Sequence, residues 1–507
     1  MDKRKSILNV SVSIGFKMVT MIAVILVKRF LIQICGNDIN GLNALYLSII
    51  GTLSVAELGV GSAITFCMYK PIVENDLDTV SALYHLFRRL YLIISGVILV
   101  AGLAITPFIT YFAKDYATLD VNFQLTFVLM LVSVVITYCF ASKTSLINAY
   151  KNNYITTAIS SGGILLQYVL QIVVLLVTGS FVGYLICRIV AAVLQWLITE
   201  IIARKKYTPI LRNVKKLQGA VKGEVLKNIK AMFMHRVGST LVNTVNGMVI
   251  SIFIGVVALG EYSNYTTILT ALTTLLKLVF TSLTSVFGHL YVESDVKTTQ
   301  KYCDAFHVLN FVLGTVFCLG YYAVIDNLIA ILFSADLIVA KSLSFVIALD
   351  GFVQFMRQST LAFREATGTF YHDRWKPLFE GIINLVLSIL LVQWVGVTGV
   401  IISTIITNLL ICHVIEPYVL YKNAFSASPK KYYLRNYSMI FLFMISLVAM
   451  HFCMCDCENV WKSILLNGLV SLGISIVLCV IVMCFNRGVV AGLLQRIKEK
   501  MKNECTN

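Results

Sequence analysis

Positively charged side chains stand inside stretches of sequence that are otherwise apolar. The deepest of them are Lys17, Arg188, Arg236, Lys277 and Arg357. A cation at the centre of a membrane-spanning helix costs about 2.5–3.5 kcal/mol on insertion scales, so such a residue normally faces water, a counter-charge or an anionic ligand. Arginine binds phosphate through two parallel hydrogen bonds, and lysine binds it as a point charge. These residues therefore predict a cationic cavity for a substrate that carries phosphate.

Two acidic residues are counted at comparable depth, Glu57 in "SVAELGVGS" and Asp350 in "IALDGFVQFMRQSTLAFRE". Asp350, Arg357 and Arg364 are spaced seven residues apart, which places them on one helical face at about 100° per residue. Internal ion pairs and a role in ion coupling or gating are both open for Glu57 and Asp350. Two acids do not balance five deep cations, so an excess of positive charge is expected.

The first apolar segment carries two more cations near its outer end, Lys28 and Arg29. Lys28 follows Lys17 by eleven residues and returns to nearly the same helical face. It is therefore a candidate substrate contact at the outer mouth of the cavity, and extension of its side chain to the membrane interface is the alternative. Arg29 points to another face and is expected to be an anchor.

The elements that must position these charges are predicted to be transmembrane helices. The chain has 507 residues, 58% of them hydrophobic and 13% charged, with a mean hydropathy of +0.84. An ordinary soluble domain has about a quarter of its residues charged, so that class is excluded. Fourteen apolar segments approach or exceed the ~20 residues that span a bilayer: 6–35, 41–69, 84–112, 121–148, 154–178, 181–203, 229–257, 261–290, 304–333, 342–366, 376–395, 398–421, 435–452 and 461–485.

The distribution of basic residues sets the predicted orientation. Most Lys and Arg residues outside the spans fall on one side of the membrane, and only Lys114, Lys341 and Lys462 fall on the other. Cytoplasmic connections are the basic ones, so both termini are expected in the cytoplasm. The net charge of +16 is then a consequence of topology and does not indicate nucleic acid. The basic connection 204–230 is expected to rest on anionic membrane phospholipid.

Motifs for enzyme chemistry are not recognisable. The chain contains no Walker A sequence, no G-x-S-x-G and no H-E-x-x-H. The cysteines of the segment "HFCMCDCENV" (451–460) have the spacing C-x-C-x-C, which is poor geometry for one tetrahedral metal. We therefore expect no enzymatic activity, no metal and no cofactor.

The sequence contains a hidden duplication. An offset of 219 residues superposes 41–79 on 260–298 with ten identities in 39 positions, and both copies contain "VExD". The same offset carries Lys17 onto Arg236, so both copies have a cation at one level of their first helix. Six predicted spans separate the copies, so the repeats run parallel. Transporters use this plan with a substrate site near mid-membrane between the halves.

Several stretches resemble a known family. They are "RFLIQICGNDINGLNALYLSI" (29–49), "LGVGSAITF" (58–66), "IGVVALGEYSNYTTI" (254–268) and "NLVLSILLVQWVGVTGVIISTIITNLL" (384–410). They are similar to segments of the bacterial polysaccharide flippases, the O-antigen and capsule type of the multidrug/oligosaccharidyl-lipid/polysaccharide exporter superfamily. The resemblance covers most of the chain.

The resemblance implies an all-α polytopic membrane protein with two parallel six-helix repeats in a V-shaped, MATE-like fold, plus two C-terminal helices. Residues 1–203 are then the first six-helix bundle, and 204–228 a basic cytoplasmic linker. Residues 229–421 form the second bundle, and 422–507 the two extra helices and a basic cytoplasmic tail.

The family's activity implies a function. It is the transfer of an undecaprenyl-diphosphate-linked oligosaccharide across the bacterial inner membrane by alternating access, for surface polysaccharide biosynthesis. The lipid-linked oligosaccharide, polysaccharide polymerase and glycosyltransferases are the implied partners, and Lys17, Arg236 and Lys277 occupy suitable places for cavity cations. The alternative is a MATE-type multidrug/cation antiporter, which would want a deep acid in the first span, where this chain has cations.

Overall fold

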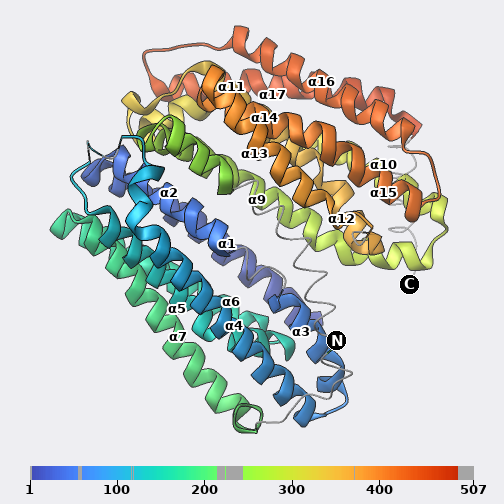
Figure 1. The fold of residues 1–507 in the computed structure, drawn as a ribbon. Coiled ribbons are helices and arrows are strands. Elements are labelled where there is room, and N and C mark those ends of the chain that lie inside the picture. Colours follow the sequence, from blue (N-terminus) through green and yellow to red (C-terminus); the bar gives the residue numbers. More distant parts are fainter. Residues whose placement is uncertain are drawn as a thin grey trace. The chain divides into compact units, whose positions relative to one another are not determined.

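The structure is a computed structural model that describes residues 3–54, 60–115, 117, 119–213, 223, 244–369 and 372–488. Every regular element in this part of the chain is a helix (Figure 1). A helix satisfies all of its backbone hydrogen bonds internally, which lipid requires because it offers neither donors nor acceptors. The predicted all-α class is therefore confirmed.

Ten helices of the described residues are long and apolar enough to cross a membrane, judged by length and composition. Each of the ten coincides with one of the predicted spans. Of the other four, 229–257 lies mostly outside the described residues, and 261–290 lies within the long helix α9 (Val256–Glu293). The chain is a multi-pass membrane protein.

Two predicted spans are divided in the structure. The segment 41–69 is split between α2 (Asn37–Leu53) and α3 (Val60–Val73), with 55–59 outside the described residues. The segment 342–366 is split at Arg357 between α11 (Lys341–Met356) and α12 (Gln358–Thr367). The second division matters for the candidate site, because it places Arg357 at the junction between two helices.

The helices form two compact units. The first contains the described residues of Met1–Ser263 and Pro377–Gly381, and the second those of Asn264–Lys376 and Ile382–Asn507. The predicted boundary at 203 remains a prediction. Part of the predicted linker 204–228 is helical, because α7 continues to Arg212, and most of the rest lies outside the described residues.

Among its described residues, the first unit contains α1 to α7, the 3-10 helix η2 (Thr106–Phe112), the short helix Thr244–Phe253 and the start of α9. Here α7 packs against α5 and α6, and α1 packs against α6. The α-helices up to α7 are α1 (Lys3–Cys35), α2, α3, α4 (Leu77–Ile105), α5 (Phe123–Ala149), α6 (Asn153–Thr178) and α7 (Phe181–Arg212).

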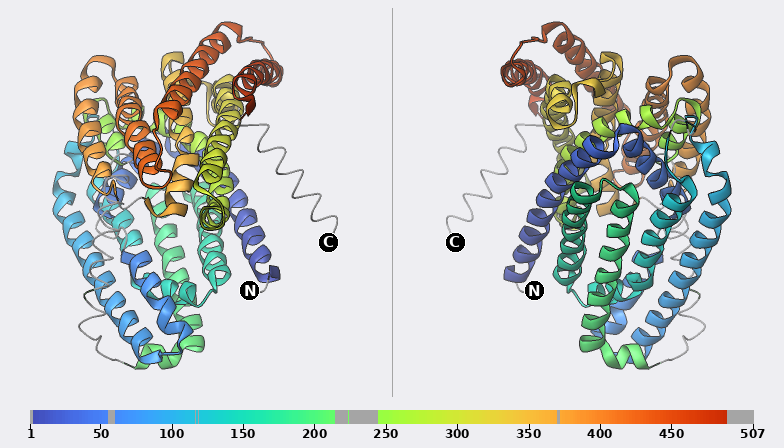
Figure 2. Two further views of the ribbon diagram at one scale, coloured as in Figure 1. Left: turned by 90° about the vertical axis from the view of Figure 1, so that its right-hand side faces the viewer. Right: turned by 90° about the vertical axis from the view of Figure 1, so that its left-hand side faces the viewer.

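The second unit is centred on α10 (Val296–Leu332), which packs against α11, α16 (Lys430–Cys453) and α17 (Val460–Phe485). Figure 2 shows the red α16 and α17 beside the yellow-green α10. Aromatic side chains fill the core at one end of this unit, where the Phe287 and Phe363 rings stack at 4.2 Å between centroids. This unit also contains most of α9, η4 (Ala335–Leu337), α12, most of α13 (Lys376–Val395), α14 (Val397–Thr407), the π-helix η6 (Asn408–Cys412) and α15 (His413–Asn423).

Residues repeated in the sequence have matching structural roles. Asp76 caps the N-terminus of α4 by accepting a hydrogen bond from the backbone N–H of Thr79. Asp295 caps α10 in the same way through the N–H of Thr298. A carboxylate at this position satisfies an otherwise unpaired donor and complements the positive end of the helix dipole. The equal roles support the parallel duplication.

The paired tyrosines Tyr46 and Tyr265 also correspond. Both are completely buried. The Tyr46 hydroxyl donates to the carbonyl of Phe123 at 3.0 Å, and the Tyr265 hydroxyl donates to Asp326 Oδ1 at 2.7 Å. Each tyrosine thus joins the second helix of its repeat to a neighbouring helix, and a buried phenol needs such a partner.

Gly41 and Gly260, which the offset of 219 residues superposes, lie at the same helix crossing inside the first unit. A Cβ atom on Gly41 would lie 1.8 Å from the carbonyl oxygen of Val256 and 3.0 Å from the amide nitrogen of Gly260. A Cβ on Gly260 would lie 2.5 Å from the carbonyl oxygen of Asn37. Small residues let two helices approach with their backbones in contact. Only glycine fits at this crossing of α2 and α9.

We therefore expect Gly41→Ala to lower the free energy of unfolding by about 1–3 kcal/mol, because the new methyl group forces the two helices apart. Thermal unfolding of the purified chain in detergent measures the effect. Gly96→Ala on α4 is the matched control, since nothing lies within 4 Å of the added Cβ and alanine favours the helix. Equal stability of the two variants would contradict the close crossing.

Candidate functional site

The first helix carries cations without any acid. The 33 residues of α1 contain neither Asp nor Glu. Lys17 is exposed, and within the described residues its ammonium forms no ion pair. Lys28 is 8% exposed and donates to Ser263 Oγ on α9 at 2.6 Å. The two lysines thus differ, because Lys28 contributes to packing in the first unit while Lys17 remains accessible.

Other predicted site residues lie apart or outside the described residues. Arg188 is half-buried on α7, within electrostatic range of the phenol groups of Tyr168 and Tyr184. Arg236 and Glu57 both lie outside the described residues. The structure therefore bears on neither of them.

Three predicted residues gather in the second unit. Lys277 on α9, Asp350 on α11 and Arg357 lie within electrostatic range of one another. Asp350 Oδ2 accepts a hydrogen bond from Gln354 Nε2 at 2.7 Å, whereas Oδ1 is buried and accepts none from the described residues. A buried carboxylate oxygen without a partner is a place where a proton or a cation can bind.

The Arg357 side chain is held by a residue absent from the sequence-based prediction, Glu416 on α15. Arg357 Nη2 and Nε donate to the two carboxylate oxygens of Glu416 at 2.5 and 3.1 Å. Arg357 Nη1 donates to Asn408 Oδ1 at 2.6 Å. This is the bidentate geometry that guanidinium and carboxylate prefer. The guanidinium is therefore engaged on all three nitrogens.

Two further cations reach the same carboxylate. Lys376 Nζ lies 2.6 Å from Glu416 Oε1, and Arg364 Nη1 lies 3.5 Å from it. Arg364 also forms an ion pair with Asp373. The side chains of Lys376, Arg364 and Glu416 are 4%, 4% and 2% exposed. These residues form a largely buried network, and we call Arg357, Arg364, Asp373, Lys376 and Glu416 the Glu416 network.

Local breaks in the helices create the network. At the end of α11 the regular hydrogen bonding stops, and the Asn310 side chain on α10 donates to the carbonyls of Phe355 and Met356 at 2.9 and 3.0 Å. Carbonyls freed at a helix end must find such partners when they are buried. Across from this junction, η6 is a single turn of π-helix between α14 and α15. Turns of this kind occur frequently at functional sites.

The network corrects the charge count made from the sequence. That count included two deep acids and overlooked Glu416, and it did not include among the deep cations Arg364 and Lys376, which lie at the ends of the predicted spans 342–366 and 376–395. Both are buried, and both contact Glu416. The first unit also has a paired acid, Glu200, which binds Lys143. These pairs add Arg364, Lys376 and Lys143 to the cations and Glu416, Asp373 and Glu200 to the acids, so the excess of positive charge is unchanged.

A signal for Glu416 is present in the sequence. It is the only acid in the predicted span 398–421, and a lone acid within lipid is expected to have a cationic partner. Its partners are 40, 52 and 59 residues away in sequence. No helical periodicity predicts pairings at those distances.

The contacts of the predicted cations separate those that hold helices together from those that are able to bind a substrate. Arg357 donates from all three of its guanidinium nitrogens and holds helices together. Lys277 is half-buried on α9 and, among the described residues, has neither an ion pair nor a hydrogen bond. Lys17 is exposed on α1. Of the cations that the sequence predicts to bind substrate and that the structure describes, Lys17 and Lys277 are thus best able to contact an anionic substrate.

Solved structures share this fold. The lipid II flippase MurJ in its inward closed conformation matches with a TM-score of 0.62 and 12% identity, covering 95% of this chain and 99% of that one. An inward-facing multidrug-resistance MATE family transporter of the MOP superfamily matches with a TM-score of 0.61 and 14% identity, covering 86% and 98%. A variant of the Vibrio cholerae MATE transporter VcmN gives a TM-score of 0.52 and 12% identity, covering 86% and 100%.

These likenesses establish the fold, because they extend over nearly the whole of each solved chain. No protein-family model matches the sequence, and no curated protein matches it. The MATE-like helical fold predicted from the sequence is therefore confirmed.

We expect Glu416→Gln to destabilise the protein by about 3–5 kcal/mol, because it leaves buried cations without their counter-charge. The thermal unfolding midpoint of the purified chain in detergent measures this loss. Glu74→Gln is the matched control, since the Lys70–Glu74 pair spans 3.9 Å and its side chains are 84% and 57% exposed. An exposed pair contributes at most about 1 kcal/mol. Similar midpoints for the two variants would contradict a structural role for the network.

Proposed function

We propose that this protein is a flippase of the bacterial polysaccharide type. Its cargo is an undecaprenyl-diphosphate-linked oligosaccharide, carried from the cytoplasmic to the outer leaflet of the inner membrane by alternating access through a cationic cavity. Both termini face the cytoplasm. The product serves surface polysaccharide assembly, in which glycosyltransferases supply the cargo and a polysaccharide polymerase consumes it.

The observation that carries the proposal is Lys17. It is exposed on a predicted membrane helix that has no acid, and no described residue neutralises it. A lysine at such a place is stable where water or an anionic ligand reaches it. The diphosphate of a lipid-linked sugar supplies an anion at that depth.

The fold comparison supports the same proposal. The lipid II flippase covers 95% of this chain, whereas the MATE transporters cover 86%. A flippase of lipid II handles a lipid-linked substrate, which is the class of cargo proposed here. The membrane potential favours the direction as well, because each negative charge leaving an inside-negative cell gains ~2.3 kcal/mol per 100 mV.

Within this proposal the site residues have different roles. Lys17, Lys277 and Arg236 contact the diphosphate, and Arg357 positions the helices through Glu416. Arg188 and Lys28 are further cations along the path. Asp350, with its unpartnered Oδ1, and Glu57 serve ion coupling or gating.

A MATE-type multidrug/cation antiporter is the alternative on the same fold. It would bind a cationic drug or a coupling ion through a deep carboxylate. Asp350 is the described residue that suits this role, although it lies beside the cations Lys277 and Arg357. The two functions differ in the charge of the cargo, so a direct transport assay separates them.

We expect Lys17→Gln to slow lipid transport by about tenfold or more, because a charge-assisted hydrogen bond contributes ~1.5–3 kcal/mol. The full chain is reconstituted in liposomes with a fluorescent undecaprenyl-diphosphate oligosaccharide. The measurement is the rate at which the label appears in the opposite leaflet. Lys277→Gln is expected to have a similar effect.

Lys70→Gln is the matched control, because Lys70 is exposed at the last turn of α3 and pairs only weakly with Glu74. Its rate should stay within about twofold of the wild type. Full transport by both Lys17→Gln and Lys277→Gln would contradict the proposed contacts with the diphosphate. Proton-driven ethidium transport by the wild type, without lipid transport, would establish the antiporter instead.

A further inference from the structure

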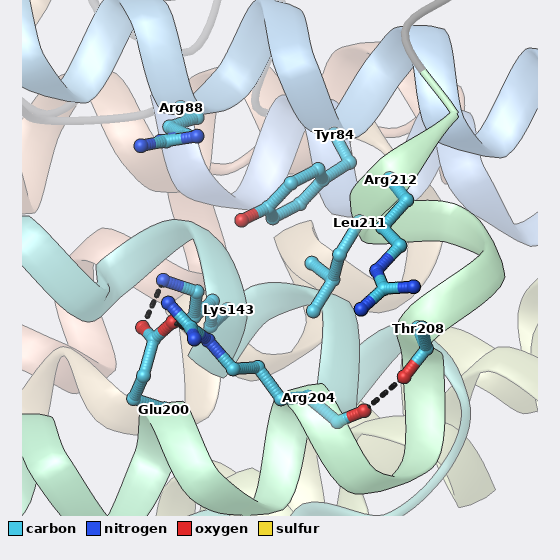
Figure 3. A pocket seen from close by; sticks show the side chains of 8 residues that line it. All are labelled: Tyr84, Arg88, Lys143, Glu200, Arg204, Thr208, Leu211 and Arg212. Carbon is cyan, nitrogen blue, oxygen red and sulfur yellow. Dashed lines mark hydrogen bonds and ion pairs between the residues drawn. The ribbon is translucent and has the colours of Figure 1, made fainter.

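A pocket of about 250 Å³ lies within the first unit, between α4, α5 and α7 (Figure 3). None of the predicted substrate contacts lines it. Its lining consists of four cations, one acid and three uncharged residues: Arg88, Lys143, Arg204, Arg212, Glu200, Tyr84, Thr208 and Leu211. The pocket is therefore strongly cationic.

The end of α7 is shaped to form one wall. The helix kinks at Tyr207, whose φ of −126° and ψ of 25° are not helical. The turn after the kink is fixed to the start of α4, where Ser81 Oγ donates to the carbonyl of Ile210 at 2.8 Å and Asn213 Nδ2 donates to Asp78 Oδ1 at 2.7 Å. These contacts hold Leu211 and Arg212 opposite α4.

The charges of the pocket are only partly balanced from within. Glu200 accepts hydrogen bonds from Lys143 and, at 2.6 Å, from Arg204 Nε. Within the described residues, Arg88 and Arg212 form no ion pair. Figure 3 shows the Tyr84 hydroxyl between these two arginines. The lining therefore has three positive charges in excess, two of them on guanidinium groups without a partner.

The position of the pocket along the helices fits a membrane interface. Arg88 lies in the N-terminal half of α4, Lys143 near the end of α5, and Arg204 and Arg212 in the last part of α7. By the predicted orientation this is the cytoplasmic side. Basic pockets between transmembrane helices on that side suit anionic lipid headgroups, and paired arginines suit the oxygens of a phosphate.

Simple extension of separate side chains to the interface does not account for the arrangement. Arg88 and Arg89 are both exposed, but only Arg88 lines the pocket. The pocket instead brings cations from three helices around one hollow beside a buried tyrosine. We propose that it binds a phosphate group, carried by an anionic phospholipid or by a soluble phosphate compound. This site is separate from the proposed transport path.

Binding to the purified full chain in neutral detergent tests the proposal. One arm adds phosphatidylglycerol and counts bound lipid by native mass spectrometry, and the other titrates inorganic pyrophosphate by calorimetry. We expect one of the two probes to bind, and the Arg88→Gln, Arg212→Gln double variant to weaken that binding about tenfold or more, because it removes two charge-assisted contacts. Binding of phosphatidylglycerol alone identifies a lipid site, and binding of pyrophosphate alone identifies a soluble ligand.

Two further variants test whether the effect is specific to the pocket. Arg89→Gln makes the same charge change one residue away and should alter the dissociation constant by less than about twofold, because Arg89 does not line the pocket. Glu200→Gln removes the one acid from the lining and should tighten binding. Failure of the wild type to bind either probe would overturn the proposal, as would equal losses in Arg89→Gln and the double variant, or weaker binding by Glu200→Gln. None of these outcomes depends on the transport assay.

Discussion

The Glu416 carboxylate is the common partner of Arg357, Arg364 and Lys376, and its side chain is only 2% exposed. Charges cut off from water must be balanced where they stand, because lipid cannot solvate them. The three cations come from the junction of α11 and α12, from α12 itself and from the first residue of α13. At the break in this unit, Asn310 binds the backbone carbonyls that the interrupted helix leaves free, and Glu416 balances the cations gathered there.

The two repeats share their helix caps and buried tyrosine hydrogen bonds but differ in their charged residues. Both have an aspartate cap, Asp76 or Asp295, and both have a buried tyrosine that joins the second helix to a neighbour. The deep charges form a large network in the second unit and a smaller group around Glu200 in the first. Duplication therefore preserved the scaffold, while the ionisable residues of each half diverged.

Sequence reasoning succeeded where the physical signal was local. Runs of apolar residues predicted ten of the described helices at nearly their observed positions, and an offset comparison found residues with equal roles. It failed for Glu416, Arg364 and Lys376, because their pairing joins helices far apart in the chain. The π-turn η6 and the junction at Arg357 were also missed, since neither contains a glycine, and the only nearby proline, Pro417, comes after η6.

The π-turn η6 sets the rotational register of α15. Asn408 and Glu416 are eight residues apart and both bind Arg357. In an uninterrupted α-helix, residues at this spacing differ by about 80° around the axis. A π-turn absorbs roughly one extra residue, so the pair behaves as if it were seven apart and the difference falls to about 20°. The π-turn thus keeps Glu416 directed toward the cation that Asn408 also binds. If the same residues formed a regular α-helix, Glu416 would lie about 80° from Asn408 around the axis.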